Sequence, residues 1–309
     1  MTTDNERFLR LWYEINSKEI GHHFENIVDA TQSSYKWFPY NKGGGFRKWA
    51  GYQSLVVNWK NGGKEISEAG MNSFRGKDFY FKEGITWSDV ATGNFSCRHT
   101  QTGFIFDIKG TSAFPYKKDL GVIASILNSK VGSYILNMLN PTMSYQSGDV
   151  RRIPLPEILF ERKTELQIAF MRLVELSSLD WRYSEISMTF QVPPLFSIEK
   201  VKDSLKSTYF KLRSQWQSMI DEMKRLEEEN NKIFVEAYGL EDELTPEVPL
   251  KEITLTCNPY YRYDSKKSPE QLETLLKADT MREFISYAVG CMFGRYSLDK
   301  PGLILANQG

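Results

Sequence analysis

The chain is poor in the residues that build disulfide frameworks and metal sites. Its 309 residues include three cysteines, which are odd in number and far apart, and three histidines. No spacing of these residues matches a zinc site. This composition favours a reduced protein without structural disulfides.

Long apolar runs are also lacking. Residues 1–10 are polar, which excludes a signal peptide at the start of the sequence. The most apolar stretches, near 119–139 and 284–293, are interrupted or shorter than the ~20 apolar residues that span a bilayer. The sequence therefore predicts a cytoplasmic protein with no membrane contact.

The formal net charge is zero, but the charge is unevenly distributed. Residues 36–118 hold 13 Lys and Arg against 6 Asp and Glu, whereas residues 161–309 hold 20 against 24. A basic block beside an acidic one indicates an anionic partner for the first block.

The richest part of the basic block is the segment 36–52, KWFPYNKGGGFRKWAGY. It holds six aromatic residues, four cations, no acid and a glycine triplet at 43–45. Cations neutralise phosphates, flat side chains stack on bases, and glycines allow close approach of a backbone. The segment fits a nucleic-acid-binding surface and, equally, an aromatic-rich β-hairpin with a solvated basic rim.

Short aromatic and β-branched runs predict a compact antiparallel β region within 36–118, with strands at 54–59, 78–87, 94–99 and 103–108. One apolar face then predicts a single helix from Leu120 to Met138.

The rest of the chain has mainly helical periodicity. Helices are expected at 161–177, at 198–237 and from Ser268, an N-cap, to about Phe293. The 198–237 helix should end at Gly239 and pair with a neighbouring helix as a spacer or coiled coil. A strand is expected at 252–256, and the acids at 227–229 are expected on a solvated face.

Together these patterns predict an α+β fold. The expected organisation is a lead-in at 1–35, a β-rich recognition domain at 36–160, a helical spacer at 161–240 and a partial C-terminal domain at 241–309.

The sequence holds one motif that suggests catalysis. Asn258-Pro259-Tyr260-Tyr261 approximates the Asn-Pro-Pro-Tyr loop with which amino-methyltransferases hold a flipped base. The second proline is a tyrosine here, and no glycine-rich cofactor loop follows a strand upstream. A structural turn is the preferred interpretation, and no catalytic residue is assigned.

Several long segments resemble PglX-type adenine-specific DNA methyltransferases of BREX phage-defence systems, relatives of the fused restriction–modification enzymes. The similar segments include WFPYNKGGGFRKWAG (37–51), FYFKEGITWSDV (79–90), residues 127–156, residues 231–256 and residues 285–309. The resemblance implies the target-recognition and helical region of such an enzyme, with the catalytic domain elsewhere. TDNERFLRLW (3–12) resembles the family's entry into that region, so we expect an internal fragment or a split-gene product.

The resemblance implies duplex DNA as partner, together with a methyltransferase domain and other BREX proteins. S-adenosyl-L-methionine is implied for the full-length enzyme, and no cofactor is expected in this chain. The residues expected to contact or shape the DNA are Lys36, Trp37, Tyr40, Lys42, Arg47, Lys48, Trp49, Tyr52, Lys82, Trp87, Arg98, Lys109, Ser144 and Gln146.

Two alternatives stay open at this point. One is a helical interaction or scaffold protein, whose basic surface docks a protein. The other is a free-standing methyltransferase that uses the loop at Asn258.

Overall fold

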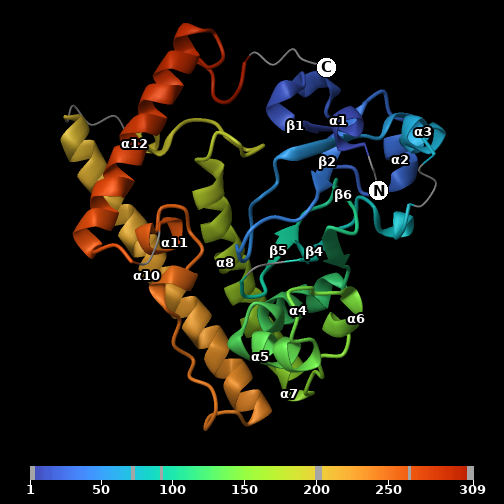
Figure 1. Ribbon diagram of the computed structural model, residues 1–309, viewed down its shortest axis with the longest axis vertical. Coiled ribbons are helices and arrows are strands. Elements are labelled where there is room, and N and C mark those ends of the chain that lie inside the picture. Colours follow the sequence, from blue (N-terminus) through green and yellow to red (C-terminus); the bar gives the residue numbers. More distant parts are fainter. Residues whose placement is uncertain (1–3, 71–73, 91–92, 199–203, 264–265, 305–309) are drawn as a thin grey trace.

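The computed structural model describes residues 4–70, 74–90, 93–198, 204–263 and 266–304. Helix accounts for 51% of the chain and strand for 11%, and the strands form small sheets, so the predicted α+β class is confirmed. Figure 1 shows the sheets beside one group of short helices, with the longest helices on the other side of the molecule.

The first sheet has four strands in the order β1-β3-β2-β6. The pairs β1–β3 and β3–β2 are antiparallel, whereas β6 lies parallel to β2. The strands are β1 (Leu9–Leu11), β2 (Trp37–Asn41), β3 (Leu55–Asn58) and β6 (Ile105–Phe106). Every residue of β2 is buried, including its aromatic residues Trp37, Phe38 and Tyr40.

The second sheet is antiparallel, with the order β5-β4-β7. Its strands are β4 (Gly84–Ser88), β5 (Cys97–Thr100) and β7 (Gly110–Ala113). The strands predicted at 54–59, 78–87, 94–99 and 103–108 correspond to β3, β4, β5 and β6, which are shorter, and β4 and β5 each end one residue later than predicted. The prediction of an antiparallel region is wrong for β6, which pairs in parallel with β2.

The predicted helix from Leu120 to Met138 is two helices, α4 (Leu120–Leu127) and α5 (Lys130–Leu139), bent by 74°. Ser129 caps α5 by accepting from the Gly132 amide. The Asn128 carboxamide bonds to both the amide and the carbonyl of Cys97. The single-helix prediction is wrong because the bonds between Asn128 and Cys97 hold the break between α4 and α5 against β5.

Two long helices carry much of the remaining chain. Helix α10 (Leu205–Tyr238) ends at Gly239 with φ 64°, and α12 (Pro269–Met292) begins after Ser268, as predicted. Helix α8 (Lys163–Arg182) packs against α10, and Figure 1 shows it between α10 and the sheets. A coiled coil and the domain boundaries stay predictions.

The remaining helices are short. They are α1 (Asn5–Phe8), α2 (Ile27–Gln32), α3 (Lys60–Glu68), α6 (Ser147–Val150), α7 (Ile158–Glu161), α9 (Pro194–Ser197) and α11 (Pro259–Arg262). Single 3-10 turns occupy Trp12–Glu14, Ser17–Glu19, Lys77–Phe79, Lys117–Asp119 and Leu250–Glu252.

The strand predicted at 252–256 is wrong. The chain there leaves a 3-10 turn and runs as an irregular segment whose polar groups bond to side chains instead of to a strand. The amides of Thr256 and Cys257 donate to the Asp180 carboxylate, and the Lys48 amide donates to Thr254 Oγ1.

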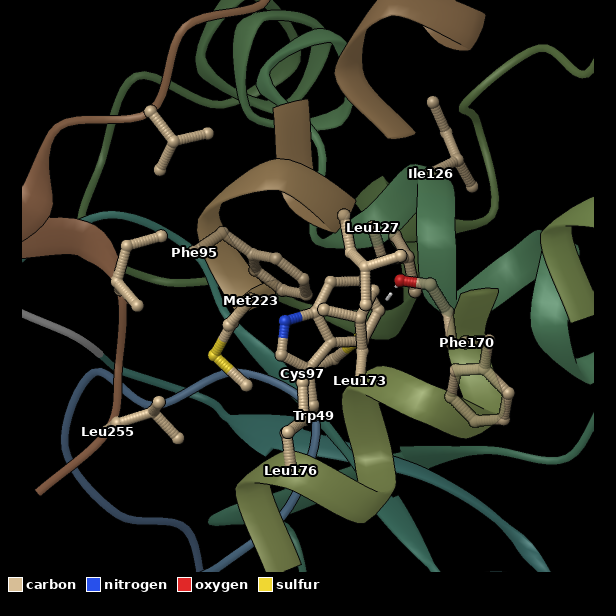
Figure 2. Close-up of a cluster of buried hydrophobic side chains, with 14 of the residues drawn as sticks. Trp49, Phe95, Cys97, Ile126, Leu127, Phe170, Leu173, Leu176, Met223 and Leu255 are labelled. Carbon is tan, nitrogen blue, oxygen red and sulfur yellow. Dashed lines mark hydrogen bonds between the residues drawn. The ribbon is translucent and has the colours of Figure 1, made fainter. Parts of the chain in front are cut away.

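The main core cluster extends from Trp49 through the helices to Leu276. Figure 2 shows Trp49 surrounded by Cys97 of β5, Leu173 of α8 and Met223 of α10. The segment 36–52 therefore supplies part of the interior.

Within the residues described, no single helix is both long and apolar enough to cross a bilayer. The bent pair Lys117–Leu127 and Lys130–Leu139 reaches that length and composition only when its two helices are taken together, and most of α4 is buried in the core.

Candidate nucleic-acid interface

The glycine triplet forms a loop that is tied to two other loops. The Gly44 amide donates to Ser88 Oγ at 2.9 Å, and the Ser88 hydroxyl donates back to the Gly44 carbonyl at 2.6 Å. Gly43 has φ 98°, and a Cβ there would lie 2.7 Å from the Lys109 carbonyl oxygen. Glycine is required at 43 because the chains approach this closely.

The loop that follows α5 contacts the segment 88–90, which also holds the glycine loop. The Tyr145 amide donates to the Asp89 carbonyl at 2.7 Å, and Ser144 pairs with Val90 as an antiparallel bridge. Lys109 Nζ lies 3.0 Å from Asp89 Oδ2. Four segments distant in sequence therefore meet, and we call them the loop edge: residues 42–46, 88–90, 107–110 and 140–152.

The loop edge presents several cations and polar groups to solvent. Lys109, Gln146, Arg151 and Arg152 are exposed, and Lys42 is half-buried. Within the described part of the chain, Lys42, Arg151 and Arg152 have no ion-pair partner. Free cations on an exposed edge can bind phosphates, and the neighbouring amide and hydroxyl groups can contact bases.

Four of the predicted contact residues, Lys42, Lys109, Ser144 and Gln146, belong to this edge. Arg151 and Arg152 are absent from the predicted set, and the signal that indicates them is an adjacent basic pair after a polar loop.

Two predicted cations lie elsewhere. Lys36 precedes β2 whereas Lys42 follows it, so the five residues of the strand, at about 3.3 Å each, separate them. Lys82 precedes β4, whereas Ser88 of the loop edge ends that strand. Both side chains remain available to solvent, with Lys82 over the Phe79 ring and Lys36 over the Trp37 ring.

The other predicted residues are enclosed, and a direct contact with DNA is not open to them in this structure. The aromatic residues that would need to be exposed for stacking are instead core residues: Trp37, Tyr40, Trp49 and Trp87. Tyr52 is half-buried and lies edge-on to Trp181, with ring centroids 5.6 Å apart. Because these rings are packed in the interior, they cannot stack on bases. Their predicted contact with DNA is wrong, and their role is structural.

Arg47 is 1% exposed, so its predicted contact with DNA is wrong. Its Nη2 lies 2.9 Å from Asp180 Oδ2, and the same nitrogen donates to the Ser177 carbonyl at 3.0 Å. Its Nε donates to the Ala50 carbonyl at 2.7 Å. The guanidinium joins α8 to the segment 36–52, and these bonds hold it in the interior.

Lys48 is buried in the same way. Its Nζ lies 2.6 Å from Glu227 Oε2, and Trp49 Nε1 donates to the other oxygen of that carboxylate at 2.7 Å. Glu227 is 2% exposed, so its predicted place on a solvated face is also wrong. A buried charge requires a partner of opposite charge. Here Lys48 of the segment 36–52 and Glu227 of α10 neutralise each other.

Arg98 is buried on β5 with its side chain over the Tyr52 ring at 5.5 Å. Its Nη1 has no hydrogen-bond partner within the described residues. Burial lowers the pKa of Arg98 to about 10. This cation faces the interior, so its predicted contact with DNA is also corrected.

The loop at Asn258 is a structural turn, as predicted. Asn258 is fully buried, and its amide nitrogen donates to the carbonyls of Leu250 and Ile253 at 2.7 and 2.9 Å. Its oxygen accepts from the Tyr260 amide and caps α11. These bonds occupy the groups that a methyltransferase would present to an amine.

Metal ligation finds no support in the part of the chain that the structure describes, where no group of three or more His, Cys, Asp or Glu side chains is suited to hold an ion.

With this geometry established, comparison with known proteins identifies the class. Nearly the whole chain is homologous to part of the adenine-specific methyltransferases. It is 36% identical over 322 aligned residues to the adenine-specific methyltransferase PglX of Lacticaseibacillus casei (strain Zhang), covering 99% of this chain. It is 34% identical over 306 residues to the adenine-specific methyltransferase BrxX of Escherichia coli O9:H4 (strain HS), covering 98%.

The match covers only part of each relative: the chain spans 25% of the PglX length and 24% of the BrxX length. No family model matches the chain. The resemblance to PglX-type methyltransferases of BREX systems is thereby confirmed, as a relationship to one quarter of such proteins.

Proposed function

We propose that this chain is the part of an adenine-specific methyltransferase that recognises duplex DNA, and that the loop edge is its contact surface. The observation that carries the proposal is the convergence of Lys42, Lys109, Arg151 and Arg152 from separate loops around polar side chains. The predicted recognition domain at 36–160 contains all four segments of this edge.

In this proposal the methyl transfer, with S-adenosyl-L-methionine as cofactor, requires a methyltransferase domain in addition to this chain. The buried Asn258 supports that division of labour, because the only Asn-Pro-Tyr motif in the sequence is occupied by structural bonds. Helices α8 and α10 then act as the rigid spacer between recognition and catalysis.

The experiment is a salt titration of duplex DNA binding. The triple variant Lys42→Ala/Arg151→Ala/Arg152→Ala should bind more weakly, and its log–log salt slope should fall by about 0.9 for each phosphate that the substitutions leave without a cation. The matched control, Arg225→Ala/Lys232→Ala/Lys251→Ala, removes the same charge from exposed positions on α10 and the turn after it. Equal slopes for the two triple variants would show that DNA does not bind at the loop edge.

A second candidate function, contact with a second copy of this chain, has one observation in its favour. Helix α12 carries an apolar row on its outer face, with Ile285 59%, Val289 43% and Met292 83% exposed. An apolar row of this kind is typical of a surface covered by a partner. Replacing Ile285 and Met292 by Ser should reduce self-association in light scattering and leave duplex DNA binding unchanged.

A further inference from the structure

A cavity of about 340 Å³ lies between the first sheet and α8, and none of its lining residues belongs to the loop edge. Its walls come from the His22–His23 turn, Pro39 of β2, the segment 50–53, the turn after β5, and α8 with the residues that follow it. Cavities of this size at the junction of two structural units are typical of small-molecule sites.

The lining combines apolar surface with hydrogen-bonding side chains, and its ionisable groups are the imidazoles of His22 and His23. Among the described residues that line it, none is Asp, Glu, Lys or Arg. Gln53 and Gln101 each supply an amide with both a donor and an acceptor. The Gln53 amide makes only a 3.5 Å contact with the His99 carbonyl, and Gln101 is exposed, so both remain available to a ligand.

Trp181 of α8 supplies the most unusual wall. Its side chain is 8% exposed, and its Nε1 has no hydrogen-bond partner within the residues described. That nitrogen is enclosed by protein atoms, so Trp181 contributes aromatic carbon to the wall and no donor. Phe104 adds a second aromatic side chain to the lining.

The backbone around the cavity is held in a conformation that side chains disfavour. His23 has φ 63° on one wall, and Trp49 and Tyr52 have φ 70° and 59° on either side of the wall at 50–51. The Arg47 side chain fills the space inside that turn, since a Cβ at Gly51 would lie 2.4 Å from its Nε. Strain of this kind is found where a binding wall is fixed by the surrounding packing.

We propose that this cavity binds an uncharged nitrogen heteroaromatic ligand of the nucleobase class. An amide with adjacent donor and acceptor matches the edge of adenine, which presents an acceptor beside an amino donor. Two such amides, the aromatic walls and a lining without Asp, Glu, Lys or Arg fit a flat, neutral, polar ring. The site is independent of the loop edge, and the proposed duplex contact does not depend on it.

The test measures binding of adenosine, guanosine, cytidine and thymidine to the full chain by isothermal titration calorimetry. At least one nucleoside should bind saturably, and Gln53→Ala/Gln101→Ala should weaken its affinity roughly tenfold or more. Trp181→Ala removes the aromatic wall, so it should weaken the binding of the same nucleoside several-fold. Gln215→Ala, an exposed amide on α10, is the control and should leave the affinity unchanged.

Circular dichroism confirms that each variant is folded before titration. The proposal is overturned if none of the four nucleosides saturates the wild-type chain, or if the double glutamine variant binds as tightly as wild type. Duplex DNA binding of that variant should keep the wild-type salt slope, which separates failure of this site from failure of the proposed DNA contact.

Discussion

Arg47 and Asp180 lie 133 residues apart in the chain and form a buried ion pair, with 2.9 Å between Arg47 Nη2 and Asp180 Oδ2. Asp180 also accepts from the amides of Thr256 and Cys257. One carboxylate therefore joins the basic segment, α8 and the chain before α11, and the pair organises the junction between the sheets and the helices.

Removing one side of this pair should destabilise the fold. Arg47→Ala leaves the Asp180 carboxylate buried without its counter-charge, and we expect a loss of about 3–5 kcal/mol in the free energy of unfolding. Lys109→Ala, which breaks the exposed pair with Asp89, should cost about 1 kcal/mol or less. Urea unfolding measures both.

The double variant Arg47→Met/Asp180→Leu provides a further check, because it removes both charges and should be less destabilised than Arg47→Ala. Similar unfolding midpoints for Arg47→Ala and Lys109→Ala would contradict a structural role of the buried Arg47–Asp180 pair. Loss of DNA binding in Arg47→Ala reports on folding, so Lys42 and Arg151 are better probes of the surface.

The burial of Arg47 and Lys48 also marks the limit of what the sequence predicts. Their partners, Asp180 and Glu227, are 133 and 179 residues away, and no local pattern identifies them. The surplus of cations in 36–118 was visible in the sequence, but the sequence does not show which cations are neutralised in the interior. The loop edge was predicted in part, because Lys42, Ser144 and Gln146 lie in recognisable glycine-rich and polar loops.

Helix prediction succeeded where the signal is local. The apolar period over α10, Gly239 at its end and the Ser268 cap of α12 are all set by neighbouring residues. Prediction failed at 252–256, where the distant Asp180 carboxylate takes the backbone bonds, and at Asn128, whose own side chain bonds to the distant backbone of Cys97.

Asn258 gives a second prediction, which distinguishes a structural turn from a catalytic loop. Asn258→Ala removes one of the two donors to each of the carbonyls of Leu250 and Ile253, which keep only the bonds from the Ile253 and Leu255 amides, and it removes the cap of α11. The free energy of unfolding should fall by roughly 2–4 kcal/mol. Asn26→Ala removes the cap of α2 at an exposed site and should cost about 1 kcal/mol. An Asn258→Ala variant as stable as wild type would argue against the structural role.

The cysteines give a third prediction, on reactivity. Burial raises the pKa of Cys97 to about 12, and burial, with the Asp180 carboxylate nearby, raises the pKa of Cys257 well above its usual range. Cys291 is partly exposed. Because the thiolate is the reactive form, iodoacetamide should label Cys291 first in the native protein and all three cysteines in urea. Mass spectrometry of the labelled peptides measures the order, and early labelling of Cys97 would contradict the buried placement.

Glu83 gives the last prediction, on acid stability. Its Oε1 lies 2.9 Å from His99 Nε2 and its Oε2 lies 3.9 Å from Lys117 Nζ. The hydrogen bond to His99 lowers the pKa of Glu83 below its ordinary value of 4.5, against the opposing effect of burial. A carboxylate whose pKa is lower in the folded state stabilises the fold above its unfolded pKa. That contribution disappears as the pH falls through the folded pKa.

Glu83→Gln should therefore be less stable than wild type at neutral pH, and the difference should shrink on acidification. Urea midpoints of both proteins at about pH 7, 5 and 3.5 test this dependence. Glu68→Gln, which alters an exposed i,i+4 pair with Lys64 on α3, serves as the control and should show a small difference throughout. A gap between Glu83→Gln and wild type that stays constant or widens from about pH 5 to pH 3.5, the range in which this carboxylate takes up its proton, would contradict a lowered Glu83 pKa.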